Sequence, residues 1–345
     1  MAQVLGECYF LDVGLGSAQV IDLSDDSAIV IDCGPSFPVL GDLLKRRLGK
    51  RRIAAVILSH NHADHIGGLS GLIANYRKAI DRIYLLQDRN AVDLVAQRSV
   101  AFMRDEVSKG HIPKPHLLVR QPNNVYLWPC EPPQPLTLEL LFPDVFENLD
   151  GQASGDPNAS SAVLLLSCAN GRILFGGDSN MAAWRSIHRS RNRPINCDVL
   201  AVPHHGGHLT DSLHEADDLK WLYNEAINAK TAIVSAGTVK AESGQPPNRL
   251  HLQALHSSGA CVVCTQITKH CSSAIETLRP AVLDRIPPRT IGLASQGAVA
   301  CAGTVLVEIS DAGISIVRND EHQAAINSKL VTAAGHHPCC RPAVS

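Results

Sequence analysis

The chain has 345 residues, 45% of them hydrophobic and 19% charged, as expected for a globular protein with a substantial core. Its formal net charge of -2 provides no global positive field that would attract a polyanion. No secretory signal opens the sequence, and no apolar run approaches the roughly 20 residues needed to span a bilayer. The odd number of cysteines, 11, favours a reducing compartment over a disulfide framework, so we expect a cytoplasmic protein without membrane contact.

Strands and helices alternate along the first third of the chain. Apolar runs broken by glycine predict strands within residues 7–21 and 27–34, and Asp32 ends the second of them. Leucines at helical spacing then predict a helix at 38–50, and the continuous apolar run at 52–59 is typical of a buried strand. The pattern also predicts a helix at 69–79, a strand at 82–87 and a helix near 91–107.

The rest of the chain is rich in candidate strands. They lie at 136–143, 161–178, 197–205, 231–237, 260–266 and 303–317. Two strand-rich halves with helices between them predict a sandwich of sheets flanked by helices. We expect one domain over residues 1–320 and a loosely ordered tail over 321–345.

The stretch ILSHNHADHIGG, residues 57–68, places three histidines and an aspartate within six positions at the end of a predicted strand. Imidazole nitrogen and carboxylate oxygen are ligands that suit zinc, manganese and iron. His60 and His62 could share one metal ion, while Asp64 and His65 could serve a second. A surface loop that is simply rich in histidine would rarely gather four such residues, so the stretch predicts a metal site.

The stretch SHNHADH resembles the HxHxDH signature of the hydrolases with the metallo-β-lactamase fold, and three other stretches resemble further motifs of that family. AIVIDCG resembles the first motif, whose aspartate, here Asp32, buttresses the metal loop without binding metal. GRILFGGDS resembles the strand that ends in a bridging aspartate, here Asp178. VPHHGG resembles the last motif, with His205 as the ligand and His204 facing the substrate. The resemblance covers roughly residues 5–318.

The resemblance implies a four-layer αββα sandwich of the α/β class and two divalent metal ions, Zn²⁺ or Mn²⁺. The metal ligands that it implies are His60, His62, Asp64, His65, Asp178 and His205. It also implies a metal-bridging hydroxide as nucleophile, oriented by Asp64, with His204 assisting the leaving group. The expected catalytic residues are therefore Asp64 and His204.

Within this family the sequence is most similar to the soluble hydrolase domain of ComEC-type DNA-uptake proteins. FLDVGLGSAQVI resembles their opening, with Leu15 where glutamine is usual, and NASSAVLLL resembles their asparagine–serine motif before a strand. IVSAGTVKAESGQPP is similar to a segment that ends in Gly-His-Pro, with Gln245 in place of the histidine. Asp156, Asn158 or water could complete the shell of one metal ion.

These motifs predict a metal-dependent hydrolase and favour a phosphodiesterase or nuclease with DNA or RNA as substrate. Hydrolysis of small esters, lactones or thioesters is one alternative, and a catalytically silent binding module is another. Two basic patches, KRRLGKRR at 45–52 and RSIHRSRNR at 185–193, could together contact phosphates, although each alone is more typical of solvated surface. The sequence indicates no particular protein partner.

Overall fold

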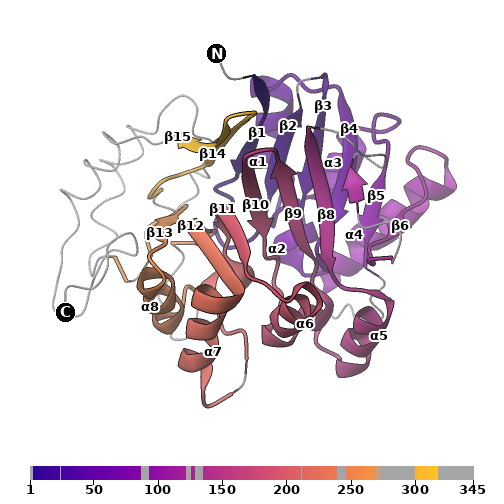
Figure 1. Cartoon of the computed structure of the whole chain (residues 1–345). Helices are drawn as coiled ribbons and strands as arrows, with labels where there is room; N and C mark the ends of the chain where they lie inside the picture. The colour runs from indigo at the N-terminus through magenta and orange to yellow at the C-terminus, as the bar shows by residue number, and fades with distance from the viewer. Residues whose placement is uncertain are drawn as a thin grey trace.

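The computed structural model describes residues 3–23, 25–86, 93–121, 126–128, 135–210, 212–238, 246–268, 270–271 and 300–317. In this part of the chain the strands form two sheets that lie face to face, and helices cover both outer faces (Figure 1). The four-layer αββα arrangement expected from the sequence is confirmed.

The first sheet has eight strands in the order β15-β14-β1-β2-β3-β4-β5-β6. They are β1 (Val4–Phe10), β2 (Gln19–Leu23), β3 (Ser27–Ile31), β4 (Arg52–Leu58), β5 (Ile83–Leu85), β6 (His116–Leu117), β14 (Val305–Ser310) and β15 (Gly313–Val317). β3, β4, β5 and β6 run parallel to one another, whereas β1, β2 and β3 are antiparallel and β14 pairs antiparallel with β1. The late hairpin β14–β15 therefore returns to the first sheet.

The second sheet has seven strands in the order β13-β12-β11-β10-β9-β8-β7. They are β7 (Tyr126–Trp128), β8 (Leu136–Phe142), β9 (Val163–Cys168), β10 (Gly171–Phe175), β11 (Ile195–Ala201), β12 (Ile227–Val234) and β13 (Cys261–Cys264). β10, β11, β12 and β13 run parallel, and β8, β9 and β10 are antiparallel.

The apolar side chains of the strands serve two layers of core at once. In β3, Ala28 and Val30 pack beneath the helices of the first sheet, whereas Ile29 and Ile31 face the second sheet. Successive side chains of a strand point to opposite faces, so a continuous apolar run is what a sheet covered on both sides requires. The apolar run in β9 divides in the same way.

The helices cover the two sheets separately. They are α1 (Phe37–Asp42), α2 (Ala63–Ile66), α3 (Leu69–Asn75), α4 (Leu94–Ser108), α5 (Val145–Ser154), α6 (Met181–Arg191), α7 (Glu215–Trp221) and α8 (Arg249–Ser257). α1, α3 and α4 contribute to the core on the first sheet, and α6, α7 and α8 to the core on the second. None of the described helices is long and apolar enough to cross a membrane.

The expected helices at 38–50, 69–79 and 91–107 correspond to α1 with the following π-turn (Leu43–Arg47), α3 and α4. α2, α5, α6, α7 and α8 were not among the expected elements. A signal for α5 was present, since Asp144 and Glu147 form a capping box at its start. The predicted tail at 321–345 lies outside the described residues, so the domain boundaries stay a prediction.

A buried aspartate just after β1 ties the start of the chain to later segments. The Asp12 side chain accepts a 2.6 Å hydrogen bond from Gln266 Nε2, and its backbone N–H donates to Thr304 Oγ1 at 3.1 Å. Burial raises the pKa of Asp12 to about 7, although hydrogen bonds from Gln266 and Gly14 act in the opposite direction. The folded state therefore holds a proton that the unfolded state releases near pH 4.

We expect Asp12→Asn to remove a pH dependence of stability. In the wild type, the contribution of Asp12 is fully present below about pH 4 and is lost as the pH rises toward about 7. The variant does not titrate and keeps an oxygen for Gln266. Urea unfolding measures the free energy of unfolding of both proteins. Between about pH 5 and about pH 8, this free energy should rise in the variant by on the order of 1–3 kcal/mol relative to wild type. A constant difference between the two proteins would contradict this expectation.

Candidate metal centre

The candidate site lies where parallel strands of both sheets end. In the first sheet, Asp32 follows β3 and His60 follows β4, and these two strands are parallel neighbours. In the second sheet, Asp178 follows β10 and His205 follows β11, again a parallel pair. Parallel strands bring their carboxyl ends to the same edge of a sheet, so four distant segments of the chain meet between the two sheets.

One group of side chains consists of His60, His62 and Asp178, whose ligand atoms all lie within 4.8 Å of one another. His60 Nε2 is 3.0 Å from His62 Nδ1 and 3.6 Å from Asp178 Oδ2. His60 is buried and His62 is half-buried. The group therefore has two imidazoles and a carboxylate, which suits a transition metal ion.

A second group consists of Asp64, His65, Asp178 and His205, again with ligand atoms within 4.8 Å of one another. His65 Nε2 lies 3.3 Å from His205 Nε2 and 3.2 Å from Asp178 Oδ1. His205 Nε2 lies 3.3 Å from Asp64 Oδ2. The two groups together contain all six residues that were expected as ligands, and Asp178 belongs to both.

The donor atoms of this cluster fit cations better than they fit one another. Asp178 is 3% exposed, and among the described residues its Oδ1 has no hydrogen bond, although His65 Nε2 lies 3.2 Å away. The other ring nitrogen of His65 faces Asp32 Oδ2 at 2.7 Å, so a neutral His65 has its hydrogen there and a lone pair toward Asp178. Lone pairs that face one another in a buried site require a proton or a metal cation between them.

The charges of the cluster follow from its burial. Burial and the neighbouring His65 hold the pKa of His60 well below its usual value, so its ring is neutral and has a lone pair to offer. Burial alone would also lower the pKa of His65, but the carboxylates of Asp178 and Asp32 raise it well above its usual value. In the metal-free protein His65 therefore carries a proton that partly neutralises the carboxylates of Asp178 and Asp32. Binding of a metal ion would displace this proton.

Asp64 lies on the open side of the cluster. Its side chain is 32% exposed, in contrast to the buried Asp178. Partial burial raises the pKa of a carboxyl group, but His205 and His65 outweigh it and hold the pKa of Asp64 well below its usual range. Asp64 is therefore an ionised carboxylate between the cluster and solvent.

A layer of hydrogen bonds behind the cluster orients its members. Asp32 accepts from the backbone N–H of Ser59 and from Ser59 Oγ, both at 2.8 Å, and faces His65. Asp32 is absent from both groups of candidate ligands, which agrees with a supporting role. Ser161 Oγ accepts from the backbone N–H of Asp178 at 2.9 Å and lies 3.4 Å from His60 Nδ1. The roles of Ser59 and Ser161 were missed, although both belong to stretches already singled out.

His204 lies beside the cluster rather than in it. Its Nδ1 donates to the backbone oxygen of His208 at 2.7 Å, and its Nε2 lies 4.0 Å from Asp178 Oδ2. The side chain is 33% exposed, so Nε2 can reach a molecule bound at the open side. His208 itself is turned toward Glu215, with Nδ1 2.8 Å from Oε2.

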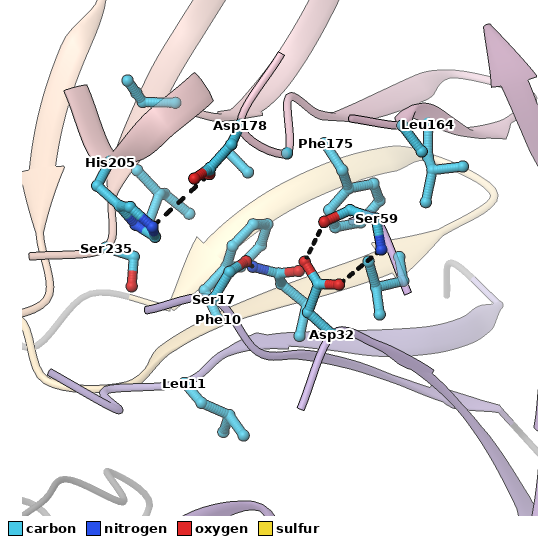
Figure 2. A pocket seen from close by; sticks show the side chains of 17 residues that line it. Phe10, Leu11, Ser17, Asp32, Ser59, Leu164, Phe175, Asp178, His205 and Ser235 are labelled. Carbon is cyan, nitrogen blue, oxygen red and sulfur yellow. Dashed lines mark hydrogen bonds and ion pairs between the residues drawn. The ribbon is translucent and has the colours of Figure 1, made fainter. Parts of the chain in front are cut away.

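A small cavity lies between the sheets beneath the cluster. Figure 2 shows Asp178 and His205 on one side of it and Asp32 and Ser59 on the other. Its volume of about 20 Å³ suits a single water molecule and no substrate. A substrate therefore has to approach from the open side, where Asp64 and His204 are exposed.

Other candidate ligands are not members of either group. Asp156 is exposed and accepts from the backbone N–H of Asn158 at 2.9 Å, as the cap of the turn Pro157–Ser160. Asn158 Oδ1 is buried and has no hydrogen bond in the described part of the chain. Cys261 and Cys264 are three positions apart on β13, so their side chains point to opposite faces and do not form a zinc pair. The stretch HHPCC at 336–340 and Gln245 lie outside the described residues.

The first basic patch lies at the far end of the first sheet from the cluster. It precedes β4, whereas His60 follows β4, which separates them by about 20 Å along the strand. Three of its six cations also have acidic neighbours: Arg46 lies 3.1 Å from Asp42, Lys50 2.5 Å from Asp22, and Arg52 2.8 Å from Asp81. The expectation that this patch contacts a substrate at the site therefore finds no support in the structure.

The second basic patch lies on α6, which begins soon after Asp178. Arg185 pairs with Asp218 at 2.5 Å and lies over the ring of Trp221, 5.1 Å from its centroid. Arg191 lies 3.4 Å from Glu139. Both arginines are therefore engaged within the chain.

We expect Asp32→Asn to lower activity while leaving two metal ions per chain at saturating metal. The substitution replaces one acceptor oxygen by an amide donor, so His65 or Ser59 loses its partner. Changes to such supporting groups typically cost about 10–100-fold in activity or metal affinity. Kinetics and elemental mass spectrometry measure the two quantities. Asp12→Asn, the same change at a buried aspartate away from the cluster, is the control, and loss of a metal ion at saturation in Asp32→Asn would contradict the assignment.

A model of the metallo-beta-lactamase superfamily matches residues 11–212, more than half of the chain, whereas no curated protein matches the sequence. The metallo-beta-lactamase fold protein YhfI from Bacillus subtilis is 15% identical, with a TM-score of 0.43 over 75% of this chain and 96% of its own. Human tRNase Z, short form, is 14% identical, with a TM-score of 0.40 over 69% and 97% of the two chains. Zn²⁺-bound PqqB from Methylobacterium extorquens is 13% identical, with a TM-score of 0.40 over 72% and 84%. The match of the family model, which spans every motif of the cluster, shows that the chain belongs to the metallo-β-lactamase superfamily.

Proposed function

We propose that the protein is a metal-dependent phosphodiesterase that holds two divalent ions, Zn²⁺ or Mn²⁺. The superfamily consists generally of metal-dependent hydrolases, and the clustered histidines and aspartates are suited to such ions. The observation that carries the proposal is the Asp178 carboxylate, because its Oδ1 faces His65 and its Oδ2 faces His60. A carboxylate in that position can serve two ions at once.

Two ions would suit the chemistry of a phosphodiester substrate. Two-metal sites supply Lewis acidity that acidifies water and neutralises charge on both the attacking and the leaving oxygen of an in-line displacement. The residues that would hold one ion are His60, His62 and Asp178, and those that would hold the other are Asp64, His65, Asp178 and His205. Asn158, whose buried Oδ1 lacks a hydrogen bond, stays a candidate for a further ligand.

Two residues of the chain would act on the substrate side of the cluster. Asp64 is ionised and partly exposed, so it can accept a hydrogen bond from the attacking water and orient it. His204 has Nδ1 committed to the His208 carbonyl, so its Nε2 is the atom that can hold a proton for the leaving oxygen. Proton transfer by a positioned side chain typically contributes about 10²–10⁴-fold in rate.

The choice of DNA or RNA as the substrate rests on the resemblance to the soluble hydrolase domain of ComEC-type proteins. The motifs that carry it are FLDVG at 10–14 and VPHHGG at 202–207. The basic patches do not strengthen the choice, because the first lies at the far end of β4 and several cations of both patches, among them Arg46, Arg52 and Arg185, pair with carboxylates of the chain. Hydrolysis of a small ester, lactone or thioester is therefore the alternative to be tested.

A turnover panel with each metal tests the proposed function. The substrates are single- and double-stranded DNA, RNA, bis-p-nitrophenyl phosphate, a lactone and a thioester, with Asp64→Ala as the inactive control. We expect phosphodiester turnover that Asp64→Ala abolishes. Brisk turnover of the lactone or thioester with no phosphodiester cleavage would overturn the proposal. A protein that binds both ions and turns over no substrate would indicate a silent binding module.

Metal content should separate the two groups of ligands. Replacing His60 and His62 by alanine removes two ligands of one group and none of the other, so we expect one ion fewer per chain. Asp178→Ala removes the shared ligand and should weaken both sites. Elemental mass spectrometry after removal of loosely bound metal measures the outcome. Wild-type metal content in the double variant would refute the assignment.

The role of His204 should depend on the leaving group. A p-nitrophenolate leaves without a proton, whereas a nucleoside alkoxide requires one. We therefore expect His204→Ala to slow cleavage of a dinucleotide by about 10²-fold or more and to change bis-p-nitrophenyl phosphate hydrolysis much less. His208→Ala is the matched control, since it removes a nearby imidazole and keeps the carbonyl that holds His204. Equal slowing of both substrates would rule out a proton donor at this position.

A further inference from the structure

The loop that carries His204 and His205 has a strained backbone. His204, His205 and Gly206 are consecutive and all have left-handed conformations, with φ of 51°, 55° and 78°. Two of them are not glycine, and each such residue costs on the order of 1–3 kcal/mol. A loop of this kind keeps its conformation only when the surrounding structure holds it.

Three hydrogen bonds from two other segments of the chain hold this loop. The backbone N–H of His204 donates to Gly177 O at 2.8 Å, which joins the loop to the segment that carries Asp178. The backbone N–H of Asn248 donates to Gly206 O at 2.6 Å. His251 Nδ1 lies 3.0 Å from Gly207 O. The last two contacts come from the beginning of α8, which is more than 40 positions away in the sequence.

The contact made by His251 has a defined direction. A carbonyl oxygen only accepts, so Nδ1 carries the hydrogen. His251 is fully buried, and this burial lowers its pKa to about 4, so the ring is neutral and Nε2 accepts. The hydroxyl of Tyr223, itself buried in the π-turn Leu222–Ala226, donates to that Nε2. The chain from Tyr223 through His251 to Gly207 is thus fully hydrogen-bonded and has one arrangement of protons.

We infer that His251, oriented by Tyr223, is a positioning residue that holds the loop Pro203–His208 and thereby the Nε2 atom of His205. The inference rests on the proposed function in so far as His205 is a metal ligand. Among the described residues, the hydrogen bonds of His251 go to Tyr223 and to the Gly207 carbonyl, not to a ligand side chain. It acts through the Gly207 carbonyl, two residues after His205.

A buried histidine can also be a simple part of the core, so the test has to separate hydrogen bonding from packing. His251→Leu keeps a bulky side chain in the core and removes the donor to Gly207. His251→Asn keeps an N–H donor near the position of Nδ1, and Tyr223→Phe removes only the hydroxyl. Leu255→Ala, at a fully buried position of the same helix, is the packing control, and a substitution of this kind costs about 2–5 kcal/mol of stability.

Two measurements read out the effect. Hydrogen exchange of the metal-free protein, followed by mass spectrometry of peptides over 203–208, reports how often the loop opens. Competition with a chelator reports the affinity of each metal site. We expect His251→Leu to speed exchange in the loop and to weaken the site that contains His205 by about 10–100-fold, with the His60 site unchanged. His251→Asn should recover most of this loss, and Tyr223→Phe should give a smaller effect.

Three outcomes would overturn the inference. Unchanged loop exchange and unchanged metal affinity in His251→Leu would make His251 a packing residue. Equal weakening of the same metal site by Leu255→Ala would attribute the effect to α8 as a whole. Failure of His251→Asn to recover any of the loss would exclude the hydrogen bond as its cause. If the wild type binds no metal, the proposed function fails, and exchange in the metal-free loop still decides whether His251 holds it.

Discussion

The buried carboxylate of Asp178 is the constraint on which the rest of the site depends. An ionised carboxylate that is 3% exposed has to be neutralised by its neighbours, because moving it out of water is costly. Its two oxygens face imidazoles from the first sheet, His60 and His65, while His205 approaches from the same sheet as Asp178. The two sheets therefore meet at one charged group. Bound cations would neutralise the Asp178 carboxylate and accept the lone pairs of the imidazoles that face it.

The fold supplies the geometry for this meeting through parallel strand pairs. β3 and β4 end at the same edge of the first sheet, and β10 and β11 end at the same edge of the second. The chain leaves these strands by abrupt turns. Five non-glycine residues of the described chain have positive φ, and three of them, Asp32, His204 and His205, lie at this edge. Backbone strain is thus concentrated where the side chains of the site need a particular orientation. Hydrogen bonds from neighbouring elements maintain these strained conformations.

Access to the cluster also restricts what it can act on. The cavity beneath it accommodates one water molecule, so the reacting bond has to lie on the outer side, beside Asp64 and His204. The first basic patch lies at the opposite end of β4, with three of its six cations next to acidic side chains. The affinity of the site for an anionic substrate would therefore come from the cluster itself rather than from a surrounding positive field.

The sequence by itself determined which strands are buried on both faces and which residue types make up the site. The apolar runs marked β3, β4 and β9, because a strand covered on both sides has to be apolar throughout. The HxHxDH motif brought four candidate ligands together, since their spacing places them on one short turn. Their order in the chain, with Asp178 and His205 later, came from the resemblance to a family.

Tertiary structure alone decided which atoms face one another. The assignment of Asp178 to both groups, the orientation of His65 by Asp32 and the support from His251 depend on contacts between residues 30 to 140 positions apart. Such contacts leave no local pattern in the sequence, because they depend on strand order and on how the sheets are packed. The same reason explains the basic patch at 45–52: composition shows that cations gather there, but only the direction of β4 shows that they lie away from the site.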